Sequence, residues 1–122
     1  MAWKLNPERQ IWLQLVDVLK FRIVSGQYPA GVKLPSVREL AAEAGVNPNT
    51  MQKAFTELER TGLIVTRRTS GRMVTEDTAL IEQVRSELAE LQISQFLTRM
   101  QHLGYHKDDS IRLLLAKKEE IS

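Results

Sequence analysis

Residues 47–53 bring together side-chain types that read the edges of bases in double-stranded DNA. Asparagine and glutamine amides can pair with adenine through two hydrogen bonds, lysine can bind guanine or a phosphate, and threonine can contact a phosphate or a thymine methyl group. On the first turns of a helix such side chains could enter a major groove, where free backbone N–H groups would attract an anion. The candidates here are Asn47, Asn49, Thr50, Gln52 and Lys53.

A second stretch, residues 67–72 (RRTSGR), holds three arginines and no acidic residue. Guanidinium groups at this density suit phosphates or a narrow minor groove. Two polar residues at the start of an earlier helical segment would lie close to the same nucleic-acid backbone. The second set of candidates is therefore Ser36, Arg38, Arg67, Arg68, Ser70, Gly71 and Arg72.

Each stretch also has a simpler interpretation. Asn49, Gln52 and Lys53 could form an ordinary solvated helix face, and the arginines could protect a β edge from aggregation. The joint arrangement of the two stretches favours recognition of nucleic acid.

Other chemistries have little support in the sequence. His102 and His106 are four residues apart, but Gly104 lies between them and breaks the helical spacing that a metal-binding pair would need. No glycine-rich phosphate loop and no nucleophile in an elbow motif is present. We therefore expect no metal site, no cofactor and no enzymatic activity.

The hydrophobic pattern predicts three helices before the arginine-rich stretch. The first covers Gln10–Ser25, and a connection at 26–35 with two glycines and two prolines follows it. The second covers Ser36–Ala44 and begins with a Ser-x-x-Glu capping box. The third has Asn47 as its N-cap and Gly62 at its end. Because a short connection joins the second and third helices, they form a helix-turn-helix candidate.

A small β-hairpin is predicted around the arginines. The β-branched residues at 63–66 and 73–75 flank the stretch, with Gly71 in the turn. Helices are then predicted from Asp77 to Leu103 and over Asp109–Glu120. The expected fold class is mainly α with this one hairpin.

The apolar stripe of the long helix changes sides near Gln92, so the helix needs two partners. The first face, formed by Leu80, Val84, Leu88 and Leu91, is expected to pack on the preceding domain. The second face is expected to join the last helix against a second copy of the chain. The residues of this expected dimer interface are Ile93, Phe96, Leu97, Met100, Leu103, Ile111, Leu114 and Leu115.

Charge supports a division into a domain at 1–76 and a helical tail at 77–122. The first part holds 11 Lys+Arg and 7 Asp+Glu, whereas the tail holds 6 and 8, so the overall charge of +2 hides a basic first part. No apolar run approaches the roughly 18 residues of a membrane span, no secretory signal is evident, and cysteine is absent. We expect a cytoplasmic protein without a membrane partner.

The run LPSVRELAAEAGVNPNTMQKAFTELERTGLI, from Leu34 to Ile64, resembles the winged helix-turn-helix of the GntR family of bacterial transcription regulators. The similarity covers roughly residues 10–75, and the short two-helix tail resembles that of the YtrA-like subgroup, in which the tail pairs two subunits. The resemblance implies DNA contacts from Arg38, Asn47, Asn49, Thr50, Gln52 and the wing at Arg68–Gly71.

Two positions depart from the family pattern. Many members have arginine where Pro48 stands, although NPNT is familiar in the YtrA-like group. The wing usually reads Gly-x-Gly, whereas this chain has Thr69-Ser70-Gly71-Arg72. Loss of the first glycine removes easy access to positive φ and predicts a different wing tip, with Arg72 taking a minor-groove or phosphate role.

These features together predict a sequence-specific DNA-binding regulator. We expect a homodimer that represses by occluding a promoter, binds a pseudo-palindromic operator and associates with the nucleoid when bound to DNA. A winged-helix module that binds another protein, without specific DNA binding, is the alternative. An unknown small-molecule effector would have to bind at the dimer junction or between tail and domain, and no residue set in the sequence marks such a pocket.

Overall fold

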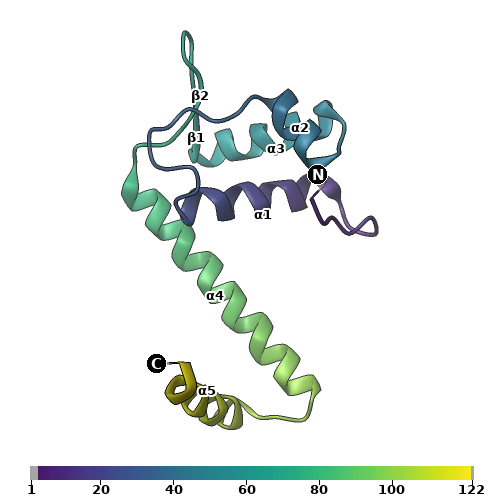
Figure 1. Cartoon of the computed structure of the whole chain (residues 1–122), viewed down its shortest axis with the longest axis vertical. Helices are drawn as coiled ribbons and strands as arrows, with labels where there is room; N and C mark the ends of the chain where they lie inside the picture. The colour runs from purple at the N-terminus through teal and green to yellow at the C-terminus, as the bar shows by residue number, and fades with distance from the viewer. Residues whose placement is uncertain (1–2, 122) are drawn as a thin grey trace. The chain divides into compact units, whose positions relative to one another are not determined.

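The computed structural model describes residues 3–121 and confirms the mainly helical fold with one hairpin (Figure 1). The chain forms two compact units, one up to Arg85 and one from Ser86 onward. The elements, in chain order, are α1 (Ile11–Val24), α2 (Val37–Ala44), α3 (Pro48–Thr61), β1 (Ile64–Arg67), β2 (Gly71–Val74), α4 (Thr78–His102) and α5 (Lys107–Ile121).

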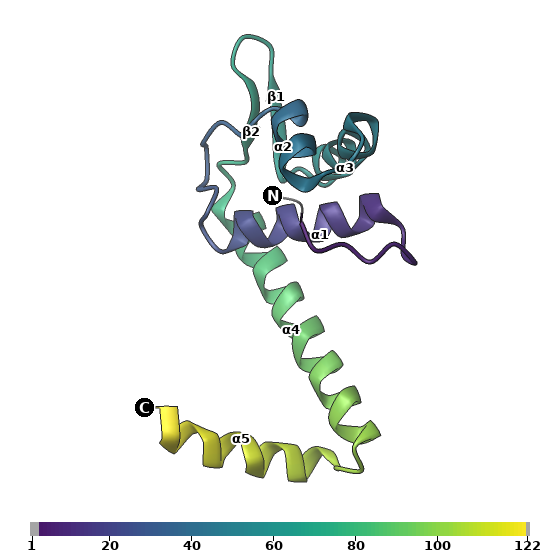
Figure 2. The same ribbon diagram turned by 45° about the vertical axis from the view of Figure 1, so that its right-hand side comes forward.

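The first unit is built around α3, which contacts α1, α2 and β1. Figures 1 and 2 show α2 and α3 on one side of α1, with the hairpin projecting away from the helices. Apolar side chains from all these elements form its core, which follows from their helical spacing and accounts for most of the driving force for folding. The largest fully buried apolar side chains are Leu15, Leu19, Ile23, Leu40, Met51, Phe55, Leu58, Leu63, Ile64 and Val74.

Local capping explains where the two helices of the helix-turn-helix begin. The Ser36 hydroxyl accepts from the Glu39 N–H at 3.1 Å, and the Glu39 carboxylate accepts from the Ser36 N–H at 3.3 Å. At α3 the Asn47 side chain accepts from the Asn49 N–H at 2.8 Å, and Pro48 follows at the first helical position. The predicted starts of both helices are therefore confirmed.

Replacing Ser36 with alanine is expected to lower the free energy of unfolding by about 1 kcal/mol, because the first turn of α2 loses its side-chain acceptor. Ser36→Gly is the control, since glycine in place of serine at an N-cap lowers the free energy of unfolding by only about a few tenths of a kcal/mol. Urea unfolding followed by circular dichroism measures both variants. Equal losses in the two variants would contradict the capping role.

The hairpin differs in detail from the expectation. Gly71 does not lie in the turn; it begins β2 and pairs with Arg67, with φ at +84°. The turn is formed by residues 68–70, and the glycine takes the left-handed conformation that closes a three-residue hairpin loop. A further bridge pairs Lys33 with Met73, so the connection before α2 runs alongside β2.

The first turns of α4 belong to the first unit. The Asp77 side chain accepts from the Leu80 N–H at 3.1 Å and caps the helix. Of the predicted stripe, Leu80, Val84 and Leu88 are half-buried and Leu91 is 51 % exposed. Ile81, which the stripe omits, is the buried residue of α4. The Arg85 Nε and Nη2 both donate to the Val24 carbonyl, at 2.9 and 2.8 Å, and hold this side of α4 at the end of α1.

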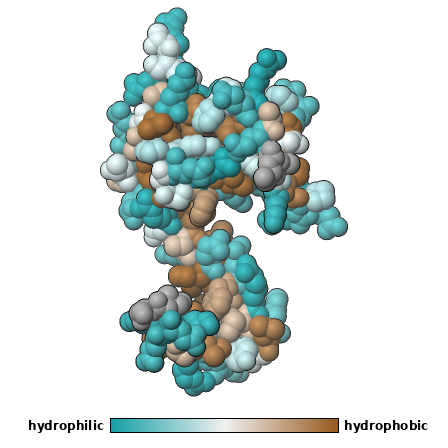
Figure 3. Space-filling view, viewed as in Figure 1, coloured by the Kyte–Doolittle hydropathy of each residue, from teal (hydrophilic) through white to brown (hydrophobic). Residues whose placement is uncertain are grey.

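The second unit consists of the rest of α4 and α5. The last helix begins two residues earlier than predicted, at Lys107, because the Asp109 carboxylate accepts from the His106 N–H at 2.9 Å and caps the first turn. Apolar side chains reach the surface of this unit, whereas the wing surface is hydrophilic (Figure 3). Within residues 3–121, eight of the twelve exposed large apolar side chains lie here: Leu91, Ile93, Leu103, Tyr105, Ile111, Leu113, Leu114 and Leu115.

Two further findings concern the described part of the chain alone. No helix in it is both long and apolar enough to cross a membrane. No three histidine, cysteine or acidic side chains within it come together as a metal-binding group.

Candidate nucleic-acid interface

Helix α3 has a buried face and a polar face. Met51, Ala54, Phe55 and Leu58 are fully buried, as their spacing predicts. On the outer side, Asn49 and Lys53 are exposed, and Thr50 and Gln52 are half-buried beside them. The buried face of α3 therefore packs on the domain, and its polar face is accessible to the major groove of DNA. Contact of these side chains with DNA stays a prediction.

Two of the candidate residues already have structural roles. The side-chain oxygens of Ser36 and Asn47 are engaged in capping α2 and α3. The Asn47 amide can donate to a phosphate, whereas the bond that its oxygen accepts from Asn49 restricts the orientation in which it could pair with adenine through two bonds. Of the two asparagines at the start of α3, Asn49 is the better base reader.

Lys53 lies against an aromatic ring on the α1 side of α3. Its Nζ is 4.6 Å from the centroid of the Trp12 ring, an ordinary distance for a cation–π contact. The Trp12 indole N–H is in turn bonded to Gln10 at 3.1 Å. The lysine remains exposed, so its ammonium group can meet a phosphate from a fixed position.

The outermost arginines of the wing are free to meet a polyanion. The side chains of Arg67 and Arg68 are exposed and make no hydrogen bond or ion pair with any other residue among 3–121. Ser70 is exposed beside them. No described residue other than glycine has positive φ, so Thr69 and Ser70 form the tip without the conformation that the missing glycine would supply.

Lys33 is a basic residue that sequence reasoning missed. Its Cε would lie 3.5 Å from a Cβ placed on Gly71, so the side chain runs from its position beside Met73 toward the turn end of the wing. It also lines a groove of about 300 Å³ that separates the start of α2, at Ser36, from Arg72. Only the non-local bridge between Lys33 and Met73 brings this lysine there, and no local sequence signal could have indicated it.

Arg72 faces α3, unlike the other wing arginines. Its Nε lies 3.0 Å from Glu59 Oε1, its Nη2 lies 3.3 Å from Gln52 Oε1, and its guanidinium carbon is 5.3 Å from the centroid of Phe55. Strand alternation is the signal that could have revealed this, because Arg72 is two residues from buried Val74 and shares its face. A role for Arg72 toward DNA competes with these contacts.

The acidic side chains of α3 are neutralised within the protein. Burial alone would raise the pKa of Glu59, but hydrogen bonds from Thr66 and Arg72 outweigh burial and hold that pKa below its ordinary value. A hydrogen bond from Arg60 lowers the pKa of Glu57. Arg38 is exposed and has no internal partner among the described residues, so the surface keeps a net surplus of unpaired positive charge.

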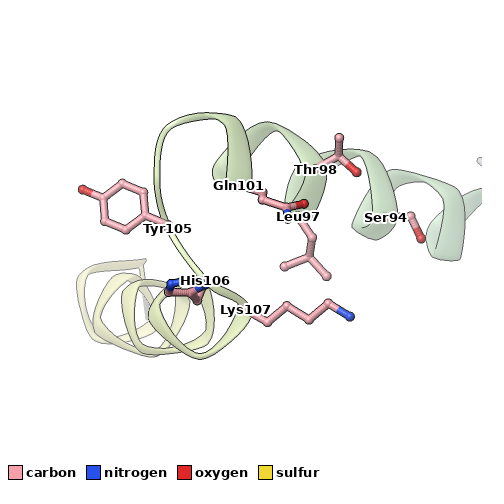
Figure 4. Close-up of a pocket in the computed structure, with 7 residues that line it drawn as sticks. All are labelled: Ser94, Leu97, Thr98, Gln101, Tyr105, His106 and Lys107. Carbon is pink, nitrogen blue, oxygen red and sulfur yellow. The ribbon is translucent and has the colours of Figure 1, made fainter.

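The second unit holds a groove of about 430 Å³ where α4 turns into α5. Leu97 and Gln101 point from α4 toward the space beside His106 and Lys107 (Figure 4). None of the side chains that line it is acidic, and the lining combines hydroxyl, amide and basic groups. They are Ser94, Leu97, Thr98, Gln101, Tyr105, His106 and Lys107.

Comparison with known proteins identifies relatives across most of the chain. The family described as "Bacterial regulatory proteins, gntR family" matches residues 12–74. The uncharacterised HTH-type transcriptional regulator YhcF of Bacillus subtilis is 35 % identical over 106 residues, covering 87 % of this chain and 88 % of its own length. The HTH-type transcriptional repressor YtrA of the same organism is 38 % identical over 96 residues, covering 77 % of this chain and 73 % of its own.

Solved structures show the same architecture. A GntR family transcriptional regulator from Listeria monocytogenes has a TM-score of 0.82 at 39 % identity and covers 92 % of this chain and 98 % of its own. YtrA from Sulfolobus acidocaldarius, a GntR-family transcription factor, has a TM-score of 0.55 at 27 % identity and covers 98 % of both chains. The likeness therefore extends past the helix-turn-helix and wing into the tail.

Proposed function

Because this chain belongs to the gntR family of bacterial regulatory proteins and is a DNA-binding regulator of transcription, we propose that it acts as a dimeric repressor of a pseudo-palindromic operator. One observation carries the DNA-reading part of the proposal. The polar face of α3 and the unpaired wing arginines lie on neighbouring elements, while the acids of α3 are neutralised internally. A polyanion would therefore meet hydrogen-bond donors and cations with little opposing charge.

The proposed DNA contacts divide into two kinds. Side chains on the outer face of α3, with Asn49 as the leading one, read bases in the major groove. Capping groups and basic side chains position the protein on phosphates. The proposed set is Ser36, Arg38, Asn47, Asn49, Thr50, Gln52, Lys53, Arg67, Arg68, Ser70 and Gly71. Arg72, which the sequence also predicts as a contact, is already engaged by Glu59 and Gln52.

We propose that the tail, residues 77–122, pairs two copies of the chain. The support is the concentration of exposed apolar side chains in the second unit, since soluble monomers rarely leave large apolar patches uncovered. A symmetric pair presents two copies of α3 and the wing, an arrangement that fits two half-sites about one helical turn of DNA apart. Such a dimer would repress by occluding a promoter, in the cytoplasm and on the nucleoid.

The groove beside Lys107 is the proposed place for a small-molecule effector.

Two substitutions are expected to separate base reading from phosphate binding. Asn49→Ala should relax base preference, because it removes the amide that reads an adenine. Arg68→Ala should weaken binding to all sequences alike and lower the salt slope of log K by about 1 per subunit, the unit in which all slope changes are given below. Both are measured by fluorescence anisotropy, at several salt concentrations, on duplexes selected by the wild-type protein from a randomised pool.

An arginine outside the proposed DNA-binding surface provides the control for Arg68→Ala. Arg112→Ala removes the same charge from an exposed site on the tail and should leave the salt slope unchanged. If wild-type protein bound selected and random duplexes with equal affinity, specific regulation would be contradicted, and the protein-binding alternative would be favoured.

A further inference from the structure

One carboxylate on α3 binds both strands of the wing. Glu59 Oε2 accepts from the Thr66 hydroxyl on β1 at 2.8 Å, and Glu59 Oε1 accepts from the Arg72 guanidinium on β2 at 3.0 Å. Thr66 and Arg72 are direct cross-strand partners in the hairpin. Glu59 therefore ties both strands to the helix at one level of the ladder.

Arg72 extends this connection along α3. The same guanidinium donates to Gln52 Oε1 at 3.3 Å, seven residues before Glu59, and lies over the ring of Phe55. Gln52 in turn donates from its amide nitrogen to the Thr56 hydroxyl at 3.3 Å. Both ends of the Gln52 amide make one hydrogen bond each, so its orientation is fixed while Arg72 holds it.

The base of the wing is held by its backbone: the Leu34 N–H donates to the Arg72 carbonyl and the Val74 N–H donates to the Val32 carbonyl, both at 2.9 Å. The wing's own ladder has only four residue pairs, and the end beyond Arg72 has no such neighbouring segment, so a side-chain connection at Arg72 limits the motion of that end. The arginines expected to meet DNA lie at the far end of this ladder, at Arg67 and Arg68. Any rocking of the hairpin on α3 would spread their guanidinium groups over many positions and lower the affinity for a fixed phosphate pattern.

We propose that Glu59 and Arg72 are positioning residues that hold the wing against α3 at the spacing DNA requires, and that Arg72 does this in place of binding phosphate. The inference rests on the proposed DNA-binding surface and adds a role for an acidic residue within it. The Arg72 and Glu59 side chains are 30 % and 32 % exposed, and an ion pair so exposed contributes little to stability. Its main effect is on the geometry of the wing.

Glu59→Gln gives a test whose sign distinguishes the explanations. The substitution removes a negative charge near a polyanion, so simple electrostatics predicts tighter binding of DNA. Loss of wing positioning predicts weaker binding, by about tenfold, because a charge-assisted hydrogen bond becomes a neutral one. Anisotropy on the selected duplex measures the change, and unfolding midpoints near that of wild type confirm that the variant is folded.

Arg72 variants test the second half of the proposal. Arg72→Gln should weaken binding about as much as Glu59→Gln, with no change in the salt slope, and the double variant should be no weaker than either single one. Arg72→Lys keeps the charge but cannot bridge Glu59 and Gln52, so its binding should also weaken. Arg67→Gln is the matched control from the same wing, expected to lower the salt slope by about 1.

Each outcome has a definite meaning. Unchanged or tighter binding by Glu59→Gln overturns the positioning role of Glu59. A salt slope lowered by about 1 in Arg72→Gln, with wild-type affinity in Arg72→Lys, overturns the role of Arg72 and makes it a phosphate contact. Failure of the wild-type protein to bind any duplex would instead refute the proposed function, so the two failures are distinguishable.

Discussion

Replacing Leu114 with glutamate is expected to convert the proposed dimer into a monomer at low micromolar concentration and to weaken operator binding by at least about 100-fold. Leu114 is 52 % exposed and lines an apolar groove of about 440 Å³ with Phe96 and Met100. In a symmetric pair the substitution occurs twice, and each copy buries an unpaired charge. A monomer then loses the gain in affinity that comes from binding two half-sites through one molecule.

Sedimentation velocity measures the mass, and anisotropy on the selected duplex measures the affinity. Leu13→Glu is the matched control, because Leu13 is 46 % exposed on α1, outside the proposed interface, and its substitution should leave the dimer intact. Sedimentation of Leu114→Glu as a dimer would remove this residue from the interface. A monomeric wild-type protein would refute the dimer altogether.

Phe55→Ala is expected to lower the free energy of unfolding by about 3–5 kcal/mol. The ring is fully buried at the centre of α3, so truncation leaves a cavity that the surrounding side chains cannot fill. The loss is a large fraction of the roughly 5–15 kcal/mol that stabilises a typical domain. It also removes the ring under Arg72 and so loosens the wing.

Urea unfolding of the two phenylalanine variants provides the comparison. Phe21→Ala is the control, since that ring is 62 % exposed on α1 and its removal should change stability by less than about 0.5 kcal/mol. A loss below about 1 kcal/mol in Phe55→Ala would mean that α3 is not the centre of the core.

Residues close together in the sequence predicted the boundaries of α2 and α3 and the buried face of α3. The capping groups of Ser36 and Asn47 and the glycines that end α2 and α3, Gly45 and Gly62, each act within a few residues. The sequence therefore contains the whole reason for those boundaries. The assignment of Met51 and Phe55 to the buried face followed from helical spacing and is confirmed.

Contacts between distant residues were beyond the same reasoning. Helical spacing indicated the half-buried Leu80 and Val84 but missed the buried Ile81, and it could not indicate that Arg85 reaches the Val24 carbonyl, 61 positions earlier. Composition groups all three wing arginines together, whereas the register of the hairpin turns Arg72 toward Glu59. The position of an arginine in the hairpin, more than its residue type, decides whether its guanidinium group is available to contact DNA.

The contact between Arg85 and Val24 has a practical consequence for isolating the DNA-binding part of the molecule. The match to the gntR family model ends at residue 74, yet the carbonyl end of α1 accepts from a guanidinium of α4, and Ile81 is buried in the same unit. A minimal recombinant fragment for NMR or crystallisation with DNA should therefore extend beyond Arg85. Ending it at Glu76 would leave the Val24 carbonyl without this partner and would remove the buried side chain of Ile81 from the unit.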